Sequence, residues 1–174
     1  MRNLDIVFTK SIKKLPIGSW SIMWWTNKEY SHVARMTTLY GSVNLYYQAS
    51  DGKVNYECSD IFLSKHQIIY KYTLNISDEL YKKISEKCVS NAGKKYGLLQ
   101  NIGIVYSDIM SKIGISVDTP FKNGQNCSEL IYECVIKELI PHLKYNKNLI
   151  KPHQIEDIIL KYFQCGVDGF YTLK

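Results

Sequence analysis

Residues 123–135 read NGQNCSELIYECV, and this stretch decides how the chain divides into structural elements. A polar loop containing Gly124 gives way here to an apolar run with helical spacing. Asn126 is a residue type that favours the N-cap position of a helix. The stretch therefore predicts a helix that begins at Cys127 and ends at Pro141, which cannot continue it.

A thiol at the first position of a helix stands where the free N–H groups and the helix dipole favour a negative charge. We expect this setting to lower the pKa of Cys127 from its free value of about 8.5. The same N–H groups could hold a developing oxyanion, so Cys127 is a candidate nucleophile. The alternative is a small buried apolar residue that happens to start a helix. This stretch alone does not decide between the two.

Helical patterns lie on both sides of the Cys127 helix. Residues 75–93 carry an apolar stripe, with Ser77 as a predicted N-cap and Gly93 as a predicted stop. Residues 96–114 are apolar on most faces and predict a buried helix. Residues 151–163 predict a short last helix that begins close to a proline.

The first half of the chain reads as strands. Asp51-Gly52 is a hairpin signal, and Gly41 and Asn44 bound an earlier turn. Together the patterns predict a meander of four or five antiparallel strands. The β-rich runs cover residues 4–10, 31–40, 44–50, 53–62 and 66–75. With strands first and helices after, residues 1–174 are expected to form a single α+β domain.

The composition limits the classes of protein to consider. The chain has 174 residues, is 45% hydrophobic and carries a net charge of +6, so it is expected to fold as a globular domain. Its basic residues are 20 Lys and only 2 Arg. Nucleic-acid readers rely on Arg for bidentate contacts, so we interpret the lysines as solvated surface and expect no nucleic-acid partner. Abundant Lys, Ile, Asn and Tyr suggest an AT-rich genome, such as that of a virus or phage.

Cysteine usage and hydropathy point to a compartment. The five cysteines are scattered without a CxxC spacing, which favours free thiols over a disulfide framework or a zinc ribbon. The sequence shows neither a secretory leader nor a long apolar run of the kind that spans a membrane. We therefore expect a cytoplasmic protein with no transmembrane segment.

A thiol nucleophile needs a base, and His32 is the best placed of four histidines. It opens a strand after a polar turn and shares a strand face with Ala34 and Met36. On the next strand, Gln48 could lie beside it, and an amide oxygen there would accept the imidazole N–H and fix the tautomer. The alternatives are a satisfied core histidine and a solvent-facing amide. The other histidines stand amid polar residues or directly after prolines: His66, His142 and His153.

The order of five short motifs resembles the circularly permuted papain-like cysteine hydrolases. These motifs are DIVF, YSHV, YYQAS, YGL and NCSELI, and together they span most of the chain. The resemblance is to the YiiX/YebB-like branch of the NlpC superfamily, which is related to lecithin-retinol acyltransferase. It implies an antiparallel sheet or small barrel packed against helices. It further implies Cys127 as nucleophile, His32 as general base and acid, and Gln48 as the third polar residue.

The chain departs from that family pattern at two positions. Leu4 stands where members often carry glycine, and Gln48 stands where many YiiX-like members have glutamate. An uncharged amide orients an imidazole more weakly than a carboxylate does. Glu57, one strand further on, is a possible substitute acid, and we rank it below Gln48.

The expected activity is cleavage of an amide bond through an acyl-enzyme, with a peptide or a lipid amide or ester as substrate. Tyr30, Ser31 and Tyr96 are candidates to line the pocket, and no metal or organic cofactor is implied. Two alternatives stay open. One is a thiol acyltransferase or lipid hydrolase of the lecithin-retinol acyltransferase type, and the other is a catalytically weak binding module of viral origin. The oligomeric state is left open.

Overall fold

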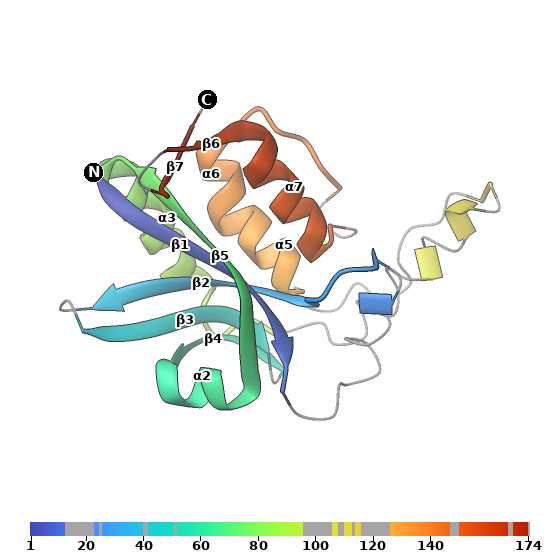
Figure 1. Ribbon diagram of the computed structural model, residues 1–174, viewed down its shortest axis with the longest axis horizontal. Helices are drawn as coiled ribbons and strands as arrows, with labels where there is room; N and C mark the ends of the chain where they lie inside the picture. The colour runs from blue at the N-terminus through green and yellow to red at the C-terminus, as the bar shows by residue number, and fades with distance from the viewer. Residues whose placement is uncertain are drawn as a thin grey trace.

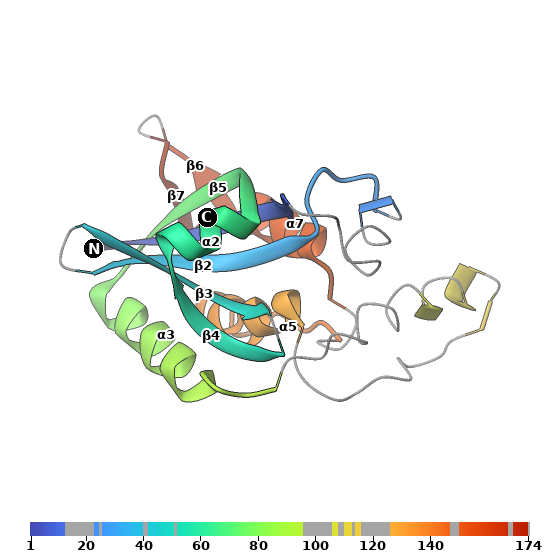
Figure 2. The ribbon, with the colours of Figure 1, turned by 90° about the horizontal axis from the view of Figure 1, so that it is seen from below.

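The protein has a mixed α+β architecture in the computed structural model (Figure 1). The structure describes residues 1–12, 23–24, 26–39, 42–50, 52–95, 106–107, 110–112, 114–115, 126–146, 150–166 and 169–173. Within these ranges seven strands form one open sheet in the order β4-β3-β2-β1-β5-β7-β6. Helices lie against both faces of this sheet (Figures 1 and 2).

The strands pair mostly in antiparallel fashion, and only β5 and β7 run parallel. The hairpin predicted at Asp51-Gly52 joins β3 to β4, and Gly52 there adopts φ +83°, a left-handed conformation that glycine adopts without strain. The strands are β1 (Arg2–Ser11), β2 (His32–Leu39), β3 (Val43–Ser50), β4 (Lys53–Cys58), β5 (His66–Ile76), β6 (Phe163–Cys165) and β7 (Tyr171–Leu173).

The helices confirm several predicted boundaries. Oδ1 of Asn126 accepts a hydrogen bond from the Glu129 backbone N–H at 2.7 Å, so a helix does begin at Cys127. Ser77 caps the helix after β5 in the same way. The helices are α2 (Ser59–Lys65), α3 (Asp78–Asn91), α5 (Cys127–Ile131), the π-helical segment η1 (Tyr132–Ile136), α6 (Lys137–Leu139) and α7 (Pro152–Tyr162). In the described ranges none of the helices has the length and apolar character that crossing a membrane requires.

Two expectations about the sheet are wrong. The run 53–62 is not one strand, because the chain leaves β4 after Cys58 and coils into α2. A continuous meander would place β5 beside β4. The α2 crossover instead carries β5 across the sheet to the far side of β1. Of the two forms the resemblance implies, a sheet or a small barrel, the described strands form the sheet, which is open and has β4 and β6 at its edges. The short strands β6 and β7 were not predicted.

The expectations about the cysteines and about residues 96–114 have different outcomes. All five cysteines are free, as predicted. The predicted helix at 96–114 falls mostly outside the described residues.

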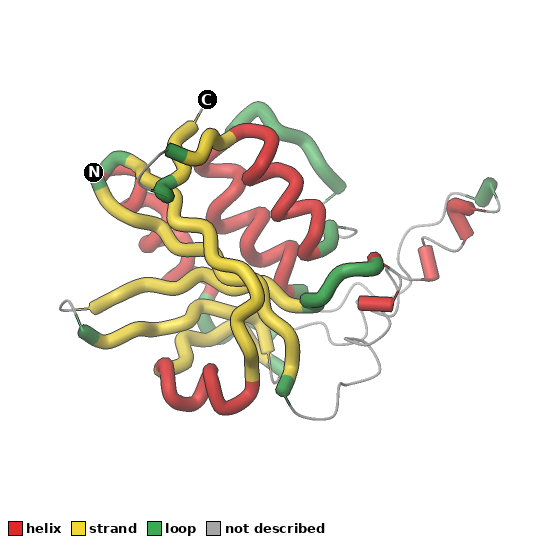
Figure 3. The backbone as a smooth tube through the Cα atoms, in the orientation of Figure 1, coloured by secondary structure: helices red, strands yellow, loops and turns green. Residues whose placement is uncertain are grey.

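The alternation of side chains along β2 separates two apolar layers. Val33 belongs to the main core, which lies between one sheet face and helices α3, α5 and α7 (Figure 3). Ala34, the next residue, belongs to a smaller cluster with Phe62 of α2 on the opposite face. The side chain of His32 therefore belongs with the α2 face, whereas Cys127 belongs with the main core.

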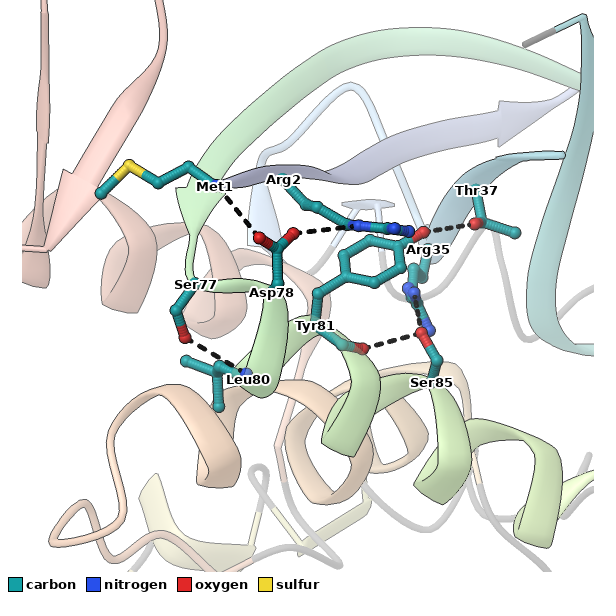
Figure 4. A network of polar contacts seen from close by, with 9 residues as sticks. All are labelled: Met1, Arg2, Arg35, Thr37, Ser77, Asp78, Leu80, Tyr81 and Ser85. Carbon is teal, nitrogen blue, oxygen red and sulfur yellow. Dashed lines mark hydrogen bonds and ion pairs between the residues drawn. The ribbon is translucent and has the colours of Figure 1, made fainter. Parts of the chain in front are cut away.

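Helix α3 is fastened to β2 by polar contacts around a buried arginine (Figure 4). The Arg35 guanidinium donates to Oγ of Ser85 at 2.8 Å and lies 5.0 Å from the ring centre of Tyr81. The Tyr81 hydroxyl is hydrogen-bonded to Oγ1 of Thr37 at 2.7 Å. These contacts hold α3 against the end of β2 that lies away from His32.

Candidate functional site

The pairing of β2 with β3 brings His32 and Gln48 together. The two strands run antiparallel, with Arg35 opposite Tyr47. Nε2 of His32 lies 2.9 Å from Oε1 of Gln48. The two residues are 9% and 0% exposed, so the contact is shielded from water. The proximity expected from the strand order is therefore present in the structure.

A second contact continues this row of side chains into β4 and α2. Nε2 of Gln48 donates to Oε2 of Glu57 at 2.8 Å. Oε1 of Glu57 accepts from Nζ of Lys65 at 2.7 Å. A carboxylate offers only acceptors, so the Gln48 amide must turn its NH₂ to Glu57 and its oxygen to His32. Nε2 of His32 is then the donor, and Nδ1 carries the lone pair.

The imidazole of His32 also has an aromatic partner. The His66 ring lies 5.0 Å from it, centre to centre, at an interplanar angle of 17°. Phe62 also stacks on the His66 ring, with 4.7 Å between ring centres, and Tyr46 stacks on Phe62 with 3.9 Å between ring centres. Helix α2 therefore supports His32 through this stack as well as through Lys65. The sequence does not single out His66, because its polar neighbours give no sign that the start of β5 lies against α2 and the His32 ring.

Cys127 is the first residue of α5, and only 2% of its surface is exposed. The sulfur lies 3.9 Å from Oγ of Ser128, and the nearby backbone N–H groups of Val33 and Ser128 favour a thiolate and so act to lower the pKa. Burial acts in the opposite direction and is the largest effect, so the pKa of the thiol is raised overall. The prediction of a lowered pKa is wrong, because the sequence indicated the helix end but not the burial.

The thiol and the imidazole row reach the start of β2 from different sides. Cys127 arrives from α5 and packs in the main core. His32 belongs with the α2 face, through its stack on His66. They come together around Val33, which directly follows His32 and whose backbone N–H is one of the groups that act to lower the pKa of Cys127. The site therefore combines a helix-end thiol with an oriented histidine one residue away along β2.

The expected pocket residues are placed differently from one another. Tyr30 is buried, and its hydroxyl donates to the carboxylate of Glu156. Ser31 is also buried, and its backbone N–H donates to the Thr9 carbonyl at 3.1 Å. Tyr96 lies outside the described residues. The Tyr30 hydroxyl is therefore engaged in a contact within the protein.

Glu156 anchors the segment that leads into β2, a role that no local pattern signals. Besides Tyr30, its carboxylate accepts from the Tyr72 hydroxyl at 2.7 Å and from Nζ of Lys28 at 2.9 Å. Burial is the largest single effect on its pKa and raises it, but the three donors together outweigh burial and lower the pKa. The cluster ties residues 28–30 to α7, and so fixes the approach to His32.

A cavity of about 300 Å³ lies toward the other end of β2. It is lined mainly by polar side chains of β1, β2 and α3, and Figure 4 shows part of its wall. The lining residues are Arg2, Asn3, Asp5, Met36, Thr37, Thr38 and Tyr81. None of the candidate catalytic residues contributes to this lining.

The described residues form no metal site, and the comparisons with known proteins give no match. Among the residues that the structure describes, no three His, Cys, Asp or Glu side chains gather as a metal ion would require. Comparison of the chain with models of known protein families gave no match, and comparison with curated proteins gave none either.

Proposed function

We propose that this protein is a cysteine hydrolase that cleaves an amide bond, with Cys127 as nucleophile, His32 as general base and acid, and Gln48 as the residue that orients His32. One observation carries this proposal. The first residue of helix α5 is a thiol that packs in the same core as Val33, and Val33 directly follows a histidine whose Nε2 lies 2.9 Å from Oε1 of Gln48. A nucleophile, a base and an orienting group are the parts that such catalysis needs.

We also propose that the fold is the permuted papain-like one. The strand bearing His32 comes before the helix bearing Cys127, which is the order in that group. The Asn126 cap places the thiol at a helix N-terminus, as the family resemblance implies. An experimental structure would test this proposal by whether the open sheet and the strands β6 and β7 match the permuted papain-like fold.

The reaction begins from a neutral thiol, since burial raises the pKa of Cys127. The proposal requires the two side chains, which approach β2 from opposite faces, to meet at the start of the strand. There Nδ1 of His32 takes the thiol proton while the sulfur bonds to the substrate carbonyl carbon. The N–H groups of Cys127 and Ser128 stabilise the oxyanion. His32 then gives the proton to the leaving amine as the C–N bond breaks. Water, deprotonated by His32, attacks the thioester and releases the acid, and the thiol regains its proton.

A second candidate function is favoured by a separate observation. The thiol is only 2% exposed, which suits a structural cysteine in a binding module that has lost activity. Such a module would retain the fold and the hydrogen bonds of His32. It would form no covalent intermediate.

The test is to trap an acyl-enzyme. Wild type is mixed with activated esters and thioesters of short peptides, and with lipid esters, and intact mass is measured after acid quench. We expect one acyl group on Cys127 in wild type, and none in Cys127→Ala or His32→Ala. Cys165→Ala, which removes an exposed thiol, is the matched control and should behave as wild type.

Two results would count against the hydrolase. One is acylation spread equally over the exposed cysteines, and the other is labelling that persists in His32→Ala. Binding to vesicles of neutral phospholipid, measured by co-sedimentation, separates a lipid substrate from a peptide one.

A further inference from the structure

We propose that Glu57 and Lys65 are positioning residues that hold the Gln48 amide in one orientation and thereby set the tautomer of His32. The catalytic consequence of this inference rests on the proposed function above. Its structural consequence, which is the nitrogen of His32 that carries the proton, does not depend on that function. Sequence reasoning had considered Glu57 only as a replacement for Gln48. The structure instead places it behind Gln48.

The contacts form a continuous row from inside the protein to its surface. His32 meets Gln48 at 2.9 Å, Gln48 meets Glu57 at 2.8 Å, and Glu57 meets Lys65 at 2.7 Å. Gln48 is fully buried, Glu57 is 8% exposed, and the Lys65 side chain is 34% exposed. The only charges in this row are therefore one carboxylate near the interior and one ammonium at the rim.

An amide alone cannot set a tautomer. The oxygen and nitrogen of Gln48 have almost the same shape, and a half-turn of the side chain would present NH₂ to His32 instead. An NH₂ group there would need an acceptor, so the imidazole would move its proton to Nδ1. The acceptor oxygens of Glu57 prevent this half-turn, because they bind only the NH₂ end.

Lys65 keeps Glu57 in this role. A carboxylate buried without a counter-charge is costly. The ammonium of Lys65, 2.7 Å from Oε1, pairs with it and keeps one of its oxygens turned toward α2 while the other accepts from Gln48. Lys65 is the last residue of α2, so this helix contributes to the site although it carries no reacting group.

The test uses a substitution that changes the direction of hydrogen bonding with little change of shape. In Glu57→Gln, Lys65 still needs an acceptor and takes the new amide oxygen. The new NH₂ then faces Gln48, whose amide must turn. The readout is the pair of imidazole ¹⁵N shifts of His32, from long-range ¹H–¹⁵N correlations at a pH where the ring is neutral. We expect the proton on Nε2 in wild type and on Nδ1 in Glu57→Gln.

The double variant Glu57→Gln/Lys65→Met removes the demand of the ammonium. The new amide can then offer its oxygen to Gln48, so we expect the proton to return to Nε2. The matched control is Glu133→Gln, which breaks another Glu–Lys pair, with Lys137, and should leave the His32 shifts unchanged. Acylation of Cys127 should fall by roughly 10²–10⁴-fold in Glu57→Gln, the range a positioned base contributes. It should recover in the double variant.

Two results overturn the inference. One is a wild-type His32 with its proton on Nδ1, and this measurement needs no variant to fold. The other is a folded Glu57→Gln that keeps the wild-type tautomer. If the tautomers are as expected but Cys127 is never acylated, the positioning role of Glu57 and Lys65 holds and the hydrolase proposal fails. If Cys127 is acylated and Glu57→Gln does not change the rate, the hydrolase proposal holds and the positioning role fails.

Discussion

The hydroxyl of Tyr30 and the carboxylate of Glu156 are joined by a buried hydrogen bond that links the segment before β2 to α7. The two residues are 126 positions apart in the chain. Tyr72 and Lys28 donate to the same carboxylate, so one acid satisfies three donors. Glu156 therefore fixes residues 28–30, the segment that leads into the strand of His32.

Glu156→Gln should destabilise the protein, because an amide replaces one of two acceptor oxygens with a donor. A buried hydrogen bond to a charged group contributes about 1.5–3 kcal/mol, and we expect a loss of unfolding free energy in that range. Urea denaturation at pH 7 measures it. Asp157→Asn, an exposed neighbour, is the control and should change stability by less than about 0.5 kcal/mol.

The same variant has a defined pH dependence. The folded-state pKa of Glu156 is lowered, so its contribution to stability is present above the unfolded value of about 4.3 and is lost as the pH falls through the folded value. The stability difference between wild type and Glu156→Gln should therefore shrink on acidification below about pH 5. A difference that grows on acidification would contradict this assignment of charge.

Gln48→Glu should not improve the proposed site, although a carboxylate orients an imidazole more strongly than an amide does. The new carboxylate would stand against Glu57, which now lies 2.8 Å from the amide nitrogen. Two adjacent carboxylates cannot both ionise easily, so the pKa of the pair rises.

The stability of Gln48→Glu should therefore be lost as the pH rises above about 4.3, which unfolding at pH 4 and pH 8 would show. Gln67→Glu places the same charge at an exposed position of β5 and is the control. Faster acylation of Cys127 in Gln48→Glu would show that the row tolerates a second charge.

Cys127 should behave as a neutral thiol at rest. Because burial raises its pKa, iodoacetamide should alkylate Cys127 more slowly at pH 7 than the exposed Cys58 and Cys165. Its rate should continue to rise above the ordinary thiol value of about pH 8.5. Peptide mapping by mass spectrometry follows each site separately. Rapid alkylation of Cys127 below pH 7 would instead indicate a preformed thiolate–imidazolium pair.

Ser85→Ala should loosen α3 from the sheet. The substitution removes the acceptor of a buried guanidinium, and we expect a cost of about 1–3 kcal/mol. Ser90→Ala, at an exposed position of the same helix, controls for the change in helix propensity. Chemical denaturation compares the two variants, and equal stability would mean that Arg35 finds another partner.

Local signals were sufficient for much of the fold. Asn126 and Ser77 cap helices where their residue type and position predict, and β3 and β4 pair as the predicted hairpin, with Gly52 between them. The contact between His32 and Gln48 follows from the same kind of information, since a hairpin register fixes which side chains are neighbours.

The features that could not be predicted depend on residues far apart in the chain. Helix α2 replaces a strand because Phe62 packs on Tyr46 below the sheet. The pKa of Cys127 depends on how completely other elements cover it, and burial outweighs the helix end. The role of Glu156 depends on three donors from two segments far from it in the chain, residues 28–30 and β5. Sequence patterns with a period of two or four residues carry none of this information.

The row from His32 to Lys65 is contained in one continuous stretch of strands β2 to β4 and helix α2. During synthesis on the ribosome this stretch emerges well before Cys127. Its contacts are local, so it can assemble quickly, whereas the thiol joins only when a distant helix docks on Val33. The growing chain would thus carry an oriented histidine before Cys127 is in place, and the proposed site would be completed only in the last stage of folding.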